Sequence, residues 1–116
     1  MITGIGLDMI ELDRIRRLDE RSPKFRTRVL TPAELVDYNG LAGRRRTEFL
    51  AGRFAAKEAF AKAMGTGIGV HCSFQSIQVL RGENGRPRIY FNEQERGFVS
   101  ITHTKGFAAA QVVLET

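Results

Sequence analysis

The side chains best suited to chemistry lie in one long segment with the character of a helix. Residues 44–64 contain one glycine and no proline, and Glu58 comes four positions before Lys62, on the same side of a helix. Their neighbours on that side include Phe54 and Ala61, and a carboxylate in apolar surroundings needs a counter-charge, hydrogen bonds or a cation. Glu58 is therefore a candidate ligand. The alternative is an ordinary surface Glu–Lys pair, worth only about 0.3–0.5 kcal/mol.

A second carboxylate, Asp8, follows Gly4-Ile5-Gly6-Leu7, where glycines permit close approach of another backbone. The pattern predicts a strand over Ile2–Ile10 that ends near Asp8. An aspartate in such a place is usually a turn or cap residue. If the fold brings Asp8 to Glu58, the two carboxylates suit Mg²⁺, which takes one or two protein carboxylates and completes its shell with water and substrate phosphates.

Three other features are weaker candidates. His103 lies in a polar stretch before a turn, where it acts either as a structural hydrogen-bonding group or as a base. The glycines at 65, 67 and 69 form no P-loop, because no Gly-Lys-Ser/Thr follows them, and we expect them to end the helix. Cys72 is the only cysteine and is expected to be a packing residue.

The elements that must position these residues are readable from local signals. A helix is predicted over Glu11–Leu18, and a second begins at the capping residue Thr31 and runs to about Asn39. Alternating β-branched residues predict four strands, over Ser76–Leu80, Arg88–Phe91, Phe98–Thr102 and Phe107–Leu114. We therefore expect an α+β fold in one domain, residues 1–116, with a small antiparallel sheet packed on a long buried helix.

Composition narrows the class of protein. The chain has 116 residues, of which 42% are hydrophobic and 27% charged, as in a globular domain. No apolar run approaches the ~20 residues that span a bilayer, and no signal peptide is evident, so we expect a cytoplasmic protein without a membrane partner. The net charge of +5 arises from clustered arginines, which indicate either an anionic partner or a solubilising surface.

Three segments together are similar to the holo-acyl-carrier-protein synthase family of phosphopantetheinyl transferases. They are residues 4–11 (GIGLDMIE) with Arg14, residues 49–67 (FLAGRFAAKEAFAKAMGTG) and residues 100–104 (SITHT). Two shorter stretches, residues 30–35 (LTPAEL) and 73–75 (SFQ), also resemble the family. The resemblance implies the phosphopantetheinyl transferase fold and transfer of 4′-phosphopantetheine from coenzyme A to a serine of apo acyl carrier protein. Adenosine 3′,5′-bisphosphate would be released, and the pathway served would be fatty acid biosynthesis.

The resemblance also implies roles at the matching positions. Asp8 and Glu58 would hold Mg²⁺, and Lys62 would neutralise or protonate the leaving phosphate, which makes these three the catalytic group. Coenzyme A would be bound by Arg53, Lys57, Lys62, Gly65, His103 and Thr104. The acidic carrier protein would be contacted by Arg14, Arg17, Arg21 and Arg28. The family further implies a homotrimer with active sites between subunits and no nucleic-acid partner.

Two other functions explain part of the sequence. A basic nucleic-acid-binding module accounts for the arginines but not for Glu58, and the chain lacks a basic stretch interleaved with aromatic residues. A trimeric protein that binds nucleotides without catalysis would retain the coenzyme A site but show no metal dependence. The transferase is the hypothesis that accounts for Asp8, Glu58 and the arginines together.

Overall fold

The computed structural model describes residues 1–116 and has an α+β architecture, as predicted. The elements follow one another as β1 Ile2–Glu11, α1 Leu12–Arg21, α2 Lys24–Val29, α3 Pro32–Asn39, α4 Arg44–Met64, η1 Phe74–Ser76, β2 Ile77–Arg81, η2 Glu83–Gly85, β3 Pro87–Phe91, β4 Gln94–Glu95, β5 Phe98–His103 and β6 Phe107–Glu115. None of the helices combines the length and hydrophobicity needed to cross a lipid bilayer.

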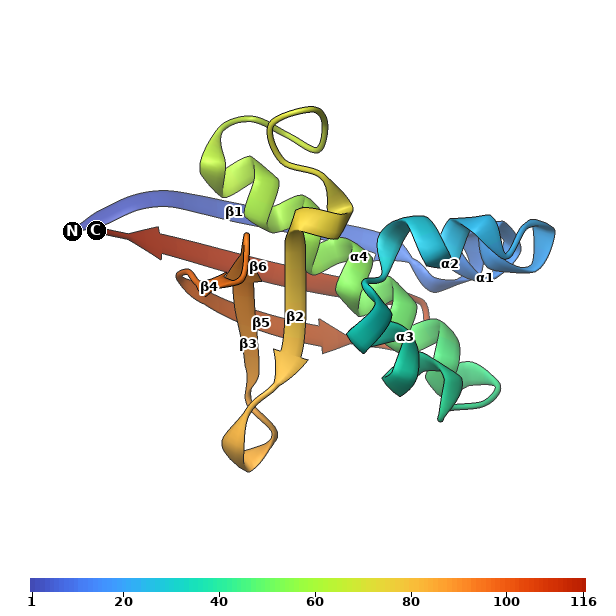
Figure 1. Cartoon of the computed structure of the whole chain (residues 1–116). Helices are drawn as coiled ribbons and strands as arrows, with labels where there is room; N and C mark the ends of the chain where they lie inside the picture. Colours follow the sequence, from blue (N-terminus) through green and yellow to red (C-terminus); the bar gives the residue numbers. More distant parts are fainter.

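The strands form two antiparallel sheets of three strands, where the sequence predicted one small sheet. The first has the order β1-β6-β5 and the second β2-β3-β4. In the first sheet Asp8 is paired with Ala110 and Ile5 with Val113, so the first and last strands of the chain are neighbours and the two termini lie side by side (Figure 1). Strands β1 and β5 are therefore the two edges of this sheet, with β6 between them.

Helix α4 lies across the first sheet and also contacts the second, which explains why it is apolar on two sides (Figure 1). Half of its buried residues are alanines, which allow backbones to approach closely. The closest approach is at Gly6 of β1, where a Cβ atom would stand 1.8 Å from the carbonyl oxygen of Ala59. The helix ends as predicted at Gly65, which has φ +83° in the left-handed region.

The short helices differ in part from the prediction. The capping box at Thr31 and Glu34 is present and α3 has the expected bounds. Strand β1 runs to Glu11, beyond the predicted end near Asp8, and α1 correspondingly starts at Leu12. Helix α2 was not predicted, because six residues show too little periodicity and are stabilised by contacts with the rest of the fold.

Candidate active site

The backbone contact between β1 and α4 brings Asp8 to Lys62. Side chains alternate along a strand, so Gly4, Gly6 and Asp8 all face α4. With no side chain at Gly6 to hold the helix away, the Lys62 ammonium reaches the Asp8 Oδ1 atom at 3.0 Å and the Leu7 carbonyl oxygen at 3.0 Å. The Lys62 side chain is 52% exposed and that of Asp8 is 17% exposed, so the ammonium lies at the surface while the carboxylate is mostly buried.

Glu58 completes the group from the previous turn of α4. Burial raises the pKa of this half-buried carboxyl above its usual value, the negative charge of Asp8 raises it further, and Lys62 acts in the opposite direction. The two carboxylates therefore interact electrostatically. Glu58 forms no ion pair within 4 Å with Lys62, so the intrahelical pair considered from the sequence does not form, and the lysine pairs with Asp8 instead.

Two neighbouring carboxylates suit a hard divalent cation. Each offers oxygen ligands, and their mutual repulsion is relieved when a cation lies between them. No group of three or more histidine, cysteine, aspartate or glutamate side chains is arranged around a common centre. A donor set of one or two carboxylates matches Mg²⁺, whose remaining positions are commonly filled by water and substrate phosphates.

A second group of predicted residues lies near the other edge of the same sheet. Arg53 and His103 both line a hollow of about 210 Å³, together with Arg45 and Arg81. The Arg53 guanidinium lies over the Phe49 ring at 4.2 Å, and its buried Nε makes no hydrogen bond. Burial lowers the pKa of Arg53, but an arginine keeps its charge in proteins. The hollow therefore presents cationic side chains to which an anion could bind.

Lys57 belongs to neither group, contrary to the expectation that it binds coenzyme A. Its side chain is fully buried, and the ammonium donates to the Glu34 Oε1 atom at 2.6 Å. Burial lowers the pKa of this lysine, and the Glu34 carboxylate acts against that effect. An ammonium enclosed by protein acceptors cannot contact a ligand without unfolding its surroundings, so in this structure Lys57 has an internal role.

The remaining predicted residues are at the surface. Gly65 caps α4, and the Thr104 hydroxyl accepts hydrogen bonds from the backbone of Gly106 and Phe107 in the turn before β6. The four arginines predicted to meet a carrier protein are exposed on α1 and α2. Only one of them, Arg17, has an acidic side chain within 4 Å. The other three, Arg14, Arg21 and Arg28, have no acidic side chain within that distance.

Comparison with known proteins identifies the family to which the chain is similar. Residues 4–113 match the model of the 4′-phosphopantetheinyl transferase superfamily. A holo-[acyl-carrier-protein] synthase of Listeria monocytogenes is 54% identical over 117 residues, with 99% of each chain covered. A crystal structure of the Bacillus anthracis synthase in complex with CoA (3′,5′-ADP) superposes with a TM-score of 0.93 at 50% identity and covers 100% of this chain and 98% of that one.

The chain belongs to the holo-[acyl-carrier-protein] synthase family of phosphopantetheinyl transferases. The Helicobacter pylori member, solved in complex with coenzyme A, gives a TM-score of 0.85 at 33% identity, covering 96% of this chain and 99% of that one. The family, the enzyme class and the fold predicted from the sequence are thus confirmed.

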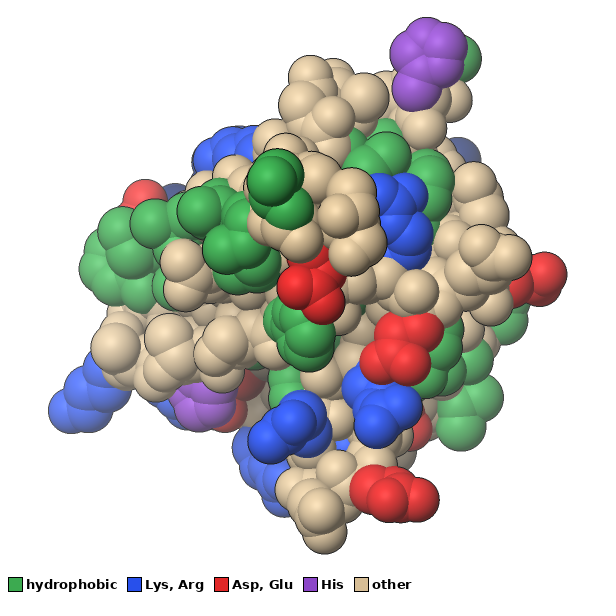
Figure 2. Space-filling model, turned by 90° about the vertical axis from the view of Figure 1, so that its left-hand side faces the viewer, with side chains coloured by type: hydrophobic (Ala, Val, Ile, Leu, Met, Phe, Trp, Pro, Cys, Tyr) green, Lys and Arg blue, Asp and Glu red, His purple; other side chains and the backbone are tan.

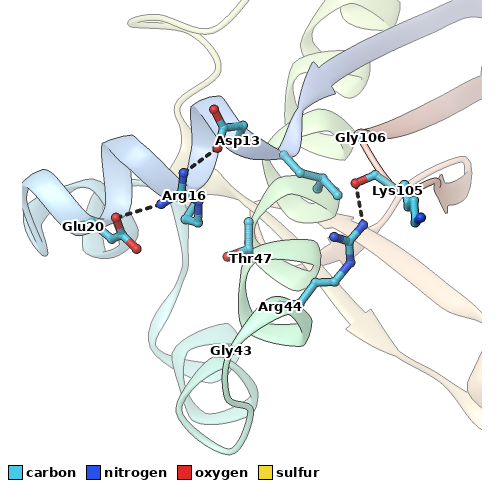
Figure 3. A pocket seen from close by; sticks show the side chains of 9 residues that line it. Asp13, Arg16, Glu20, Gly43, Arg44, Thr47, Lys105 and Gly106 are labelled. Carbon is cyan, nitrogen blue, oxygen red and sulfur yellow. Dashed lines mark hydrogen bonds and ion pairs between the residues drawn. The ribbon is translucent and has the colours of Figure 1, made fainter.

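Another hollow, of about 450 Å³, lies between α1 and the start of α4 (Figure 3). Most of its charged side chains already have partners: Arg16 pairs with Asp13 and Glu20, and Arg44 donates to the Lys105 carbonyl oxygen. The Lys105 ammonium is the exception. Neither Asp8 nor Glu58 lines it. The larger hollow therefore offers less unsatisfied chemistry than the smaller one beside Arg53.

Sequence reasoning did not predict that Glu34 forms an ion pair with a residue distant in the chain. It is fully buried, and its carboxylate accepts from the backbone of Thr31 and Val79 as well as from Lys57. The capping box identified Glu34 as a local helix-start residue, and that reading is correct but incomplete. Residues 30–35 resemble the family, yet no catalytic or binding role was predicted for them. That resemblance was the available signal for a longer-range role of Glu34.

Proposed function

We propose that this chain transfers 4′-phosphopantetheine from coenzyme A to the serine hydroxyl of an apo acyl carrier protein, in a reaction that depends on Mg²⁺. The observation that carries the proposal is the meeting of Asp8, Glu58 and Lys62, two carboxylates and one half-exposed ammonium at one edge of the sheet. Related synthases, among them those from Bacillus anthracis and Helicobacter pylori, have been solved in complex with coenzyme A. By the family resemblance, the reaction serves fatty acid biosynthesis in the cytoplasm.

The proposed chemistry is substitution at the β-phosphorus of coenzyme A. The serine oxygen forms a bond to this phosphorus, the bond to the oxygen of the α-phosphate breaks, and adenosine 3′,5′-bisphosphate leaves. The serine proton passes to a nearby carboxylate or water. Mg²⁺ held by Asp8 and Glu58 would supply charge neutralisation and orientation of the pyrophosphate, which is most of what phosphoryl-type transfer requires.

Lys62 is suited to assist the leaving group. Its ammonium is paired with Asp8 at 3.0 Å but is about half exposed, so it can turn toward a phosphate. The Asp8 carboxylate is only 17% exposed and would then be neutralised by the bound cation. An ammonium close to the departing phosphate stabilises the negative charge that develops there and can donate a proton to it. Lys62 thus needs only a change of partner, from carboxylate to phosphate.

The nucleotide half of coenzyme A is proposed to bind at the hollow beside Arg53 and His103. The guanidinium groups of Arg53, Arg45 and Arg81 provide positive charge for a phosphate group, partly offset by the Glu48 carboxylate that also lines the hollow. Phe49 offers an apolar ring beside them. This placement retains the expected roles of Arg53 and His103 and leaves out Lys57, whose ammonium is enclosed.

These two groups lie near opposite edges of one sheet, which supports a homotrimer with active sites between subunits. Asp8 is on edge strand β1, whereas Gly52 and Arg53 lie toward edge strand β5, where a Cβ at Gly52 would stand 3.0 Å from the Ile101 side chain. Neither hollow that contains Arg53 includes Asp8 or Glu58. One coenzyme A could use both groups if edge β1 of one subunit faced edge β5 of the next.

The outer face of the sheet supports the same assembly. Ile5, Leu7 and Met9 of β1 are 60–64% exposed, and Phe98 of β5 is 62% exposed. Hydrophobic side chains also gather on the left of the space-filling view (Figure 2). Contiguous exposed apolar surface of this kind usually marks an interface. Sedimentation of the purified chain should therefore give the mass of a trimer.

Transfer itself is tested by intact-mass spectrometry of an apo acyl carrier protein incubated with the chain and coenzyme A. The expected result is one phosphopantetheine added to the carrier serine with Mg²⁺ present and none after addition of a chelator. The matched control is Glu58→Gln, which keeps the side-chain shape and removes the charge. Absence of any mass change with several carriers, while the protein is folded, would refute the proposal.

A further inference from the structure

The fully buried ion pair between Lys57 and Glu34 has no part in the chemistry described above. The Lys57 ammonium donates three hydrogen bonds, to the Glu34 Oε1 atom at 2.6 Å, the Val29 carbonyl oxygen at 2.7 Å and the Phe74 carbonyl oxygen at 3.0 Å. All three N–H donors of the lysine are thereby used. These acceptors come from α3, the last residue of α2 and η1, so one side chain of α4 joins three separate segments.

Helix α2 depends on such contacts for its place in the fold. It has only six residues, too few for stability on its own. The Gln75 side-chain amide lies 2.9–3.1 Å from the carbonyl oxygens of Thr27, Arg28 and Leu30, and Lys57 binds that of Val29. Four consecutive carbonyl groups at the end of α2 are thus contacted by two side chains from elsewhere in the chain, although the two N–H groups of Gln75 can donate to only two of its three acceptors at a time.

These hydrogen bonds connect the segment that carries Glu58 of the proposed metal site with the segment that carries Arg28, an expected carrier contact. Lys57 directly precedes Glu58 on α4, and successive residues of a helix point about 100° apart, so one side chain enters the interior while the next faces the proposed metal site. At the other end of the contact, Val29 directly follows Arg28, which is exposed and has no acidic partner within 4 Å. A slide or rotation of α2 against α4 would break the hydrogen bonds of Lys57.

We propose that Lys57 is a positioning residue, which together with Gln75 fixes the carrier-binding helix α2 at a set distance from Glu58. The inference rests on the proposed function, because it requires that Arg28, the one expected carrier contact on α2, binds the carrier protein. It also gives a role to the two short stretches at residues 30–35 and 73–75, which supply Glu34, Phe74 and Gln75. Lys57 acts through α2 and touches neither substrate.

The test compares three variants of the full chain: Lys57→Met, Gln75→Ala and, as a control, Ile89→Val. Methionine fills much of the space of lysine but cannot donate to the Val29 carbonyl. Ile89 is fully buried in β3 and contributes nothing to the network, so its variant reports loss of packing alone. All are measured at a temperature at which circular dichroism shows them fully folded.

Two readouts separate positioning from stability. The dissociation constant of the apo carrier is measured by calorimetry without coenzyme A, and kcat/KM for transfer is measured by mass spectrometry. We expect Lys57→Met to weaken carrier binding and to lower kcat/KM for the carrier by about 10- to 100-fold, the effect of a displacement near 1 Å. The dissociation constant of coenzyme A should stay as in the wild type. Gln75→Ala should change the same quantities in the same direction, and Ile89→Val should change neither.

Each other outcome counts against a specific claim. Wild-type carrier binding by folded Lys57→Met overturns the positioning role. Weakened coenzyme A binding with normal carrier binding overturns it too and returns Lys57 to the nucleotide. If Lys57→Met does not fold, Gln75→Ala decides, and wild-type carrier binding by that variant overturns the inference. Carrier binding that responds as expected, in a wild-type protein that transfers nothing, would refute the proposed function alone.

Discussion

Substitution of Gly6 by alanine would test whether the close contact of β1 with α4 positions the site. An added Cβ would stand 1.8 Å from the Ala59 carbonyl oxygen and 2.8 Å from its carbon, and real Cβ atoms essentially never approach closer than 3.0 Å. The strand must therefore move away from the helix by roughly 1.2 Å, because both clashing groups belong to backbones that cannot rotate aside. Asp8 lies two residues along the same face of β1 and would move with it.

Both stability and turnover should respond to this displacement. Overpacking of a tight interior typically costs about 1–3 kcal/mol of unfolding free energy. A shift near 1 Å between catalytic groups can lower the rate about 10²-fold. We therefore expect Gly6→Ala to fold with a lower Tm, to lose most of its kcat/KM, and to bind Mg²⁺ more weakly because Asp8 and Glu58 are farther apart.

The assay needs a glycine variant without a clash as its control. Gly106 serves, since a Cβ there would meet nothing within 4 Å and its φ lies outside the left-handed region. Thermal unfolding and carrier modification by mass spectrometry are measured for Gly6→Ala and Gly106→Ala together. Equal Tm and equal kcat/KM for the two variants would show that the separation of β1 from α4 does not set the geometry of the site.

Three further changes test other parts of the molecule. Glu58→Gln should abolish Mg²⁺-dependent transfer and metal binding by calorimetry while circular dichroism stays unchanged; near-normal turnover would remove Glu58 from the site. Arg14→Glu should raise the KM for the acidic carrier at low salt and leave the dissociation constant of coenzyme A unchanged. The difference in KM should fade as salt is added, because exposed charges are screened. An equal KM at low salt would place the carrier interface elsewhere. Burial, followed by the hydrogen bond to Asp19, raises the pKa of Tyr38 to about 12 from 10.0, so the folded state keeps this proton when the unfolded state has lost it. The stability this provides is complete below pH 10 and is lost as the pH rises toward 12, at most about 3 kcal/mol, and Tyr38→Phe should lack that alkaline loss in urea unfolding.

The features that could be predicted from the sequence are those with local causes. Helix α4 has the predicted bounds because its end depends on Gly65 adopting a left-handed conformation directly after the last helical residue. The start of α3 was likewise predictable from Thr31, Pro32 and Glu34, which form the capping box within four positions. Glu58 is a candidate by residue type and apolar setting, and Asp8 by residue type and its place after a glycine-rich strand, and both signals are local.

The errors concern contacts between distant parts of the chain. Lys57 and Glu34 are 23 positions apart, and nothing local indicates that the lysine enters the interior while Glu58 beside it is half-buried. The partner of Lys62 was also uncertain for this reason, because Glu58 is one helical turn away and Asp8 is 54 positions away, yet the ion pair forms with Asp8. Helix periodicity specifies which residues share a face but not which element covers that face.

The environments of the arginines could not be predicted from the sequence either, because they too depend on contacts between distant parts of the chain. Arg26 and Arg46 lie against the Tyr38 ring at 5.3 and 4.9 Å and hold the helices together. Arg53 lies buried beside the hollow near β5, whereas Arg14 and Arg28 are exposed without acidic partners. A net charge of +5 is thus the sum of arginines with structural contacts and of arginines that we propose to face the nucleotide or the carrier protein. Salt should weaken binding through the exposed group far more than binding at Arg53, because screening acts mainly on charges in contact with solvent.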